Sequence, residues 1–143
     1  MVAYVQGDQT VVFQEGAIPG LNTYEAQILR QVTINCPGPG TIVAQATGHI
    51  TWLSTDQDIA RIWFHPHNVS LYDWETPDYD NLRIFTDCNC ADATDQYSPW
   101  SISKVYTVGS AGNLTVRVCA DNPWMESHIE IGDVSMQLMF FPQ

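Results

Sequence analysis

The chain has 143 residues, which is the size of one ordinary domain. Hydrophobic residues make up 45% of it and aromatic residues 11%, so the composition supports a packed core and excludes a disordered chain. Five Lys and Arg against 16 Asp and Glu give a net charge of -11. This balance excludes a basic surface for nucleic-acid phosphates, and an anionic membrane would repel the chain for the same reason.

The first 27 residues are expected to form an N-terminal arm. Its opening stretch, MVAYVQGDQTVVFQEG, has neither the positive nor the apolar region of a signal peptide. The longest apolar runs, such as Met136–Pro142, are far shorter than the ~20 residues of a membrane-spanning helix. We therefore expect no membrane segment and a location in a virion or outside the cell. Thr10–Phe13 predicts a short strand, and Thr23–Arg30 is the only segment that could be helical.

Strict alternation of apolar and polar residues predicts long half-buried strands over Thr41–Leu53, Asn113–Ala120 and Val134–Phe141. Weaker strand patterns occur in Ile28–Cys36, Ile59–Phe64, Leu82–Asp87 and Ile102–Val108. The side chains expected on the core side are Ile42, Ala44, Ile50, Trp52, Leu114, Val116, Val118, Met136 and Leu138.

Turn signals separate these strands. Pro37-Gly38-Pro39-Gly40 is one, and Gly109–Gly112 joins two strands by a loop of hairpin length. The sequence shows no alternation of strands with helices, no repeat and no linker. It therefore predicts an all-β single domain, an antiparallel β-sandwich of jelly-roll type over residues 28–143, preceded by the arm over residues 1–27.

The four cysteines leave two interpretations open. Cys88 and Cys90 are separated by one residue, which is too close for a zinc-binding pair. In a disulfide scheme they take different partners, for which Cys36 and Cys119 are available. The alternative is four free, partly buried thiols, which suits a chain without an export signal.

Two histidines form the strongest transition-metal candidate. In His65-Pro66-His67 the alternate spacing would point both imidazoles the same way in a regular strand, but Pro66 interrupts the strand. Cupin-type enzymes use a His-x-His pair with a nearby Glu, whereas Glu75 here lies eight residues after His67. We expect a loop with two exposed imidazoles and no activity that depends on either.

Acidic clusters raise the question of calcium, which takes six to eight oxygen ligands. The candidate ligands are Asp56, Asp58, Asp78 and Asp80, but the sequence has no calcium-loop pattern around them. We expect no cofactor, with bound calcium as the alternative. No G-x-S-x-G motif occurs and no carboxylate pair stands out, so we expect no enzyme activity. Asn68-Val-Ser and Asn113-Leu-Thr are formal glycosylation sequons.

Seven aromatic residues are expected in or beside loops. Such Tyr and Trp side chains form protein interfaces and sugar-binding platforms, or they cap the ends of the sandwich. They are Trp63, Tyr72, Trp74, Tyr79, Tyr97, Trp100 and Trp124.

Three segments carry a family resemblance: PGPGTIVAQATGHITW, YSPWSISKVYTVGSAGNLTVRVCA and the closing IGDVSMQLMFFPQ. In this order they resemble the compact jelly roll of the tumour necrosis factor and complement globular-head superfamily, in its bacterial or viral branch. The resemblance spans about residues 28–142 and implies a homotrimer without enzyme activity, packed through the C-terminal strand. The acidic insert Asp73–Asp95 and an arm without a collagen-like or coiled-coil stalk depart from the family pattern.

The final strand carries the prediction of assembly. From Leu138 to Phe141 it is apolar on both faces, and an exposed second apolar face is an aggregation liability. The candidate interface residues are Leu138, Met139, Phe140 and Phe141. The arm or another subunit is expected to cover them.

These observations favour a trimeric structural module that decorates a larger assembly such as a capsid lattice, as a virion decoration (cement) protein or a tail-fibre tip. The alternative is a secreted or surface-displayed module that binds carbohydrate or protein, of the lectin or adhesin type. A cupin-like metal enzyme built on His65 and His67 is the third hypothesis.

Overall fold

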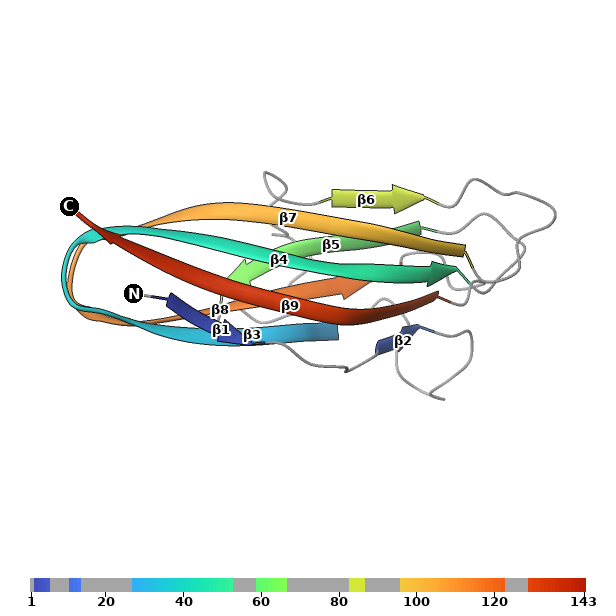
Figure 1. Cartoon of the computed structure of the whole chain (residues 1–143), viewed down its shortest axis with the longest axis horizontal. Helices are drawn as coiled ribbons and strands as arrows, with labels where there is room; N and C mark the ends of the chain where they lie inside the picture. Colours follow the sequence, from blue (N-terminus) through green and yellow to red (C-terminus); the bar gives the residue numbers. More distant parts are fainter. Residues whose placement is uncertain are drawn as a thin grey trace.

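A computed structural model describes residues 2–5, 11–13, 27–52, 59–66, 83–86, 96–122 and 129–143. This part of the chain consists almost entirely of strands (Figure 1). In chain order the strands are β1 (Val2–Val5), β2 (Val11–Phe13), β3 (Gln27–Cys36), β4 (Gly40–Trp52), β5 (Ile59–Pro66), β6 (Arg83–Thr86), β7 (Gln96–Val108), β8 (Gly112–Asp121) and β9 (Ile129–Pro142).

The strands form two antiparallel sheets packed face to face. Sheet I has the order β1-β9-β4-β7, and β2 also pairs with β9. Sheet II has the order β3-β8-β5-β6. The chain passes repeatedly from one sheet to the other, and the last strand returns beside the first, which is the arrangement of a jelly roll. The predicted all-β antiparallel sandwich is confirmed.

The core lies between the sheets because each long strand turns every second side chain inward. Nearly all the predicted core residues are buried, including Ile42, Trp52, Val118 and Leu138, each at most 1% exposed. Leu114 differs: it is half-buried and packs against the margin of the core. Its strand begins at Gly112, so Leu114 lies near the end of the sandwich.

The two turn signals do not form hairpins. Residues 37–39 join β3 of sheet II to β4 of sheet I, and residues 109–111 join β7 of sheet I to β8 of sheet II. Both connections lie at the end of the sandwich where the C-terminus lies (Figure 1). The backbone of Gln143 donates a hydrogen bond to the Pro39 carbonyl there (3.3 Å). Alternation specifies which face of a strand is buried but not which strand is its partner. The sequence pattern therefore does not distinguish a loop that crosses between sheets from a hairpin.

The described parts of the predicted arm belong to sheet I. β1 pairs with residues 136–139 of β9, and β2 pairs with residues 129–131. The strand predicted at Thr10–Phe13 is confirmed, and the strand Val2–Val5 was not predicted. The helix considered for Thr23–Arg30 is wrong over its described part, because Gln27–Arg30 begin β3. Ladder hydrogen bonds to β8 override the weak local pattern of this segment.

A bulge interrupts β9 between these two pairings. The register with β4 shifts between Thr47 and His49, and Asp133 adopts a positive φ of 51°. Asp tolerates this left-handed conformation better than most residues, and bulges turn side chains in new directions. The guanidinium of Arg30 donates from Nε to the carbonyl of Val134 (3.0 Å), which supplies a partner for the backbone beside the bulge. No helix of the described ranges is long and apolar enough to span a membrane.

Gly40 provides a first prediction. A Cβ added there would lie 2.4 Å from the carbonyl oxygen of Phe141 and 2.6 Å from the ring of Phe140. We expect Gly40→Ala to lower the free energy of unfolding by about 1–3 kcal/mol, because strand β9 must move away. Gly38→Ala is the matched control, since nothing lies within 4 Å of its added Cβ. Urea denaturation of the two variants measures the difference, and equal stabilities would contradict this close packing.

Candidate functional site

The outer face of sheet I carries side chains in rows that run across the strands. Each row contains residues paired in register on β9, β4 and β7, and successive rows lie two residues apart, about 7 Å. One row contains only apolar side chains, in the order Val2, Met139, Val43 and Val105. Phe141 follows in the next row, opposite Thr41. We call these five residues — Val2, Val43, Val105, Met139 and Phe141 — the apolar band.

The apolar band is open to solvent within the single chain. Val2 is 63% exposed, Val105 62% and Phe141 52%, whereas Val43 and Met139 are half-buried between them. β1 does not cover this surface, because it lies beside β9 and adds Val2 to the row. An apolar surface that crosses four strands is typical of a protein contact.

The four predicted interface residues divide between the two faces. Leu138 and Phe140 point into the core and are 0% and 5% exposed. Met139 and Phe141 point outward and belong to the apolar band. Only these two are therefore placed to contact another subunit. Val2, Val43 and Val105 were not predicted as interface residues, although Val43 and Val105 interrupt otherwise polar outer faces. Their alignment with Met139 depends on the register between strands, which the pattern of one strand does not predict.

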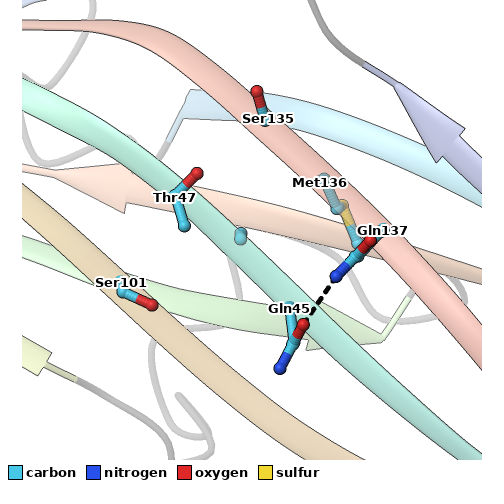
Figure 2. Close-up of a pocket in the computed structure, with 7 residues that line it drawn as sticks. Gln45, Thr47, Ser101, Ser135, Met136 and Gln137 are labelled. Atoms are coloured by element: carbon cyan, nitrogen blue, oxygen red, sulfur yellow. Dashed lines mark hydrogen bonds between the residues drawn. The ribbon is translucent and has the colours of Figure 1, made fainter.

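A polar hollow of about 280 Å³ lies next to the apolar band on the same face. Figure 2 shows its walls on three strands: Ser135 and Gln137 on β9, Gln45 and Thr47 on β4, and Ser101 on β7. The remaining lining residues are Ala46 and Met136. Gln137 Nε2 donates a hydrogen bond to Gln45 Oε1 (2.6 Å), which joins the two amides across the strands. Small hydroxyl side chains make up the rest of the polar lining.

Beyond the hollow, the bulge brings a carboxylate to a histidine. Asp133 Oδ2 lies 3.2 Å from Nδ1 of His49, and both side chains reach solvent. The His49 ring also contacts Tyr97, with ring centroids 5.6 Å apart. Tyr97 is 68% exposed. The face therefore runs from the apolar band, through the polar hollow, to an exposed aromatic ring.

The outer face of sheet II is more exposed near the short turns than farther from them. Near the short turns, cross-strand pairs between β3 and β8 satisfy one another: Thr33 bonds Thr115 (2.7 Å) and Asn35 donates to Asn113 (2.8 Å). Arg117 likewise donates to Gln31 (3.0 Å). The sequon residue Asn113 is thus exposed and hydrogen-bonded within a strand.

Farther from the short turns, Trp63, His65 and Asp121 on this face are buried, whereas Ile84 is exposed. Arg61 forms a two-pronged ion pair with Asp121, which lies directly opposite it in the strand register. His65 is only 3% exposed and accepts a hydrogen bond from Nε1 of Trp63 (3.3 Å). The expectation of an exposed imidazole at His65 is therefore wrong. Its strand continues as far as Pro66, so the proline ends β5 after the histidine rather than before it.

The two described cysteines, Cys36 and Cys119, are free and buried. Burial raises the pKa of the Cys119 thiol to about 12, and nearby Arg117 lowers it only in part. A thiol of this kind stays protonated at neutral pH, so it is a poor nucleophile. Cys88 and Cys90 lie outside the described residues. The scheme that pairs them with Cys36 and Cys119 is wrong, because both of these thiols are free.

The calcium candidates Asp56, Asp58, Asp78 and Asp80 also lie outside the described residues, as does His67. Within the described ranges, no group of three or more His, Cys, Asp and Glu side chains could hold a metal ion.

Three of the seven aromatic residues lie in described strands rather than in loops. Trp63 belongs to β5, and Tyr97 and Trp100 belong to β7. Trp63 and Trp100 are buried, so only Tyr97 offers its ring to solvent. The other four, Tyr72, Trp74, Tyr79 and Trp124, lie outside the described residues.

No protein-family model and no curated protein matches the sequence. Among solved structures, a structure of the infectious bursal disease virus Gx strain aligns with a TM-score of 0.43 and 8% identity over 96% of this chain. This chain spans 32% of that viral chain. Eiger TNF from S. frugiperda aligns with a TM-score of 0.43 and 9% identity over 100% of this chain and 93% of its own.

A third solved structure, the infectious bursal disease virus VP2 subviral particle, aligns with a TM-score of 0.31 and 10% identity. The alignment covers 100% of this chain and 42% of the VP2 chain. With TM-scores below 0.5 and identities of 8–10%, none of these three alignments assigns the chain to a family or a function.

Proposed function

We propose that this protein is a non-enzymatic structural module that assembles as a homotrimer through the outer face of sheet I and decorates a larger assembly. The observation that carries the proposal is the apolar band. Four apolar side chains align in register across β1, β9, β4 and β7, and three of the five band residues are more than half exposed in the single chain. Water contact with such a band is unfavourable, and burial in a subunit contact removes it.

A closed ring of identical subunits suits this geometry. The band lies on one side of the sandwich and at one end of it, close to the C-terminal residues of β9. Cyclic symmetry brings the same patch of every copy toward one axis, and a ring closes without leaving an unpaired patch to form fibres. The apolar band itself contains no charged residue that would oppose a contact between identical copies.

The larger assembly that we propose is the surface of a virion, with the module as a capsid decoration protein or a tail-fibre tip. The support is at the level of the fold: jelly rolls are common building units of viral capsids. Antibodies against the chain should label the surface of intact particles by electron microscopy. Particles that lack the protein altogether would contradict this location. They would not bear on the trimer, which the sedimentation of the purified protein tests.

The trimer is tested by placing a charge in the band. We expect wild-type protein to sediment at three times the 16.0 kDa of the chain, and Phe141→Asp to give monomer or insoluble protein. A carboxylate that is buried in an apolar contact without a partner destabilises that contact by several kcal/mol.

Thr33→Asp is the control for this experiment, because Thr33 is exposed on the outer face of sheet II. It should leave the sedimenting mass unchanged. A wild-type monomer at micromolar concentration, together with unchanged mass and solubility in Phe141→Asp, would rule out assembly through the band.

A further inference from the structure

We propose that the polar hollow of sheet I binds a neutral carbohydrate, with Tyr97 as the aromatic platform beside it. This binding function goes beyond the assembly proposed above. The hollow has a volume of about 280 Å³, at the lower limit of the ~300–1,000 Å³ of pockets for drug-sized ligands. It therefore has the size for a single sugar ring rather than for a large cofactor.

The lining has the chemistry that a sugar requires. Sugar hydroxyls both donate and accept hydrogen bonds, and so do the hydroxyls of Thr47, Ser101 and Ser135. The bond from Gln137 Nε2 to Gln45 Oε1 fixes the orientation of both amides. It leaves the Gln45 amide nitrogen as a donor and the Gln137 amide oxygen as an acceptor for a ligand. Donors and acceptors on three neighbouring strands thus line one shallow space (Figure 2).

The charge pattern favours a neutral ligand. Among the described residues, the lining of the hollow includes no charged side chain. The nearest charges that we identify on this face belong to the His49–Asp133 pair, whose signs oppose each other when the imidazole is protonated. The net charge of -11 repels anionic sugars at long range.

The exposed tyrosine supplies the apolar contact that sugar binding needs. A pyranose ring has a C–H face that packs on an aromatic ring, and its hydroxyls stay in contact with polar groups and water. Tyr97 is 68% exposed, and the His49 ring supports it at 5.6 Å. Asp133 in turn holds His49 at 3.2 Å. A short oligosaccharide would extend from the hollow across His49 to Tyr97.

The hollow and the apolar band occupy different parts of the face. On β4 the nearest lining residue, Gln45, lies two residues from Val43, about 7 Å, and Thr47 lies four residues from it, about 14 Å. A subunit contact through the band and a sugar in the hollow therefore use separate side chains, and the two proposals fail independently.

The test uses the intact chain on an array of immobilised neutral and anionic glycans. We expect saturable binding to a subset of the neutral glycans. Ser101→Tyr, which fills the hollow from an exposed position, should abolish this binding. Tyr97→Ala should weaken it about threefold to tenfold, the effect of losing one aromatic contact. Thr107→Tyr is the matched control, because Thr107 is also exposed on the outer face of β7 but lies three rows from Ser101, and it should bind like the wild type.

Three outcomes would overturn the proposal. One is that the wild type binds no neutral glycan, and another is that it binds only anionic glycans. The third is neutral-glycan binding that Ser101→Tyr and Tyr97→Ala both leave unchanged, which would place the ligand elsewhere on the chain. Because both substituted positions are exposed, circular dichroism should show wild-type folding in each variant, and loss of binding then reports on the hollow.

Discussion

Leu138→Ala should lower the free energy of unfolding by about 2–5 kcal/mol, the usual cost of truncating a fully buried leucine. Leu138 is 0% exposed and lies on the central part of β9. Its backbone pairs with Ala44 on one side and with Ala3 on the other, and both of these neighbours are small. Small neighbours cannot fill the space that the leucine leaves, so a cavity persists in the core.

Two other substitutions define the scale of this experiment. Thr115→Ala should cost no more than about 1 kcal/mol, because it removes one exposed hydrogen bond to Thr33. Leu114→Ala should fall between the two, since Leu114 is only half-buried. Urea denaturation at one fixed protein concentration measures all three, because an oligomer makes stability depend on concentration. A Leu138→Ala variant as stable as Thr115→Ala would show that β9 faces the other way.

The sequence predicts the strands of this fold well and their partners poorly. Alternation assigns an inner and an outer face to each strand, and the predicted core positions of Ile42, Val118 and Met136 are confirmed by their burial. The strands β3, β5 and β6 were also found, because turn residues and β-branched side chains mark them. Pairing is different, because alternating side chains specify a buried face and not a neighbour. The crossing between sheets at residues 109–111 therefore could not be distinguished from a hairpin.

In the candidate site, too, the features of single strands could be predicted and those that depend on pairing could not. Phe141 and Met139 were identified from an apolar outer face on a single strand. The apolar band as a whole depends on the alignment of Val2, Val43 and Val105 with β9, which is a property of four strands in register. The polar hollow also depends on the register of three strands. The His49–Asp133 contact depends on a β-bulge that no sequence pattern predicts. Sites assembled across strands stay hidden until pairing is known.

Alkaline pH should destabilise this protein through groups that are buried in their neutral form. Burial raises the pKa of the Cys119 thiol from 9.0 to about 12. It also raises the pKa of the Tyr106 hydroxyl from 10.0 to about 12, and that hydroxyl has no hydrogen-bond partner. Both groups ionise more readily in the unfolded chain than in the folded one. The unfolded state therefore releases protons first as the pH rises, and folding stability falls.

The pH range in which stability is lost follows from these pKa values. The contribution of Cys119 is fully present below pH 9 and is lost as the pH approaches 12, where the difference in pKa corresponds to about 4 kcal/mol. Tyr106 acts in the same direction between pH 10 and 12. Burial lowers the pKa of Lys104, so that group acts in the opposite direction, but it is present in every variant and cancels in the comparison.

Urea denaturation of wild type, Cys119→Ala and Tyr106→Phe at a series of pH values from 8 to 11 tests this linkage. We expect Cys119→Ala to lose less stability than the wild type as the pH rises, because its ionising thiol is gone. Tyr106→Phe should show a smaller version of the same effect. At pH 8 it should be at least as stable as the wild type, since it removes a buried hydroxyl that lacks a partner. Parallel pH dependences in all three proteins would show that neither group is buried as the fold requires.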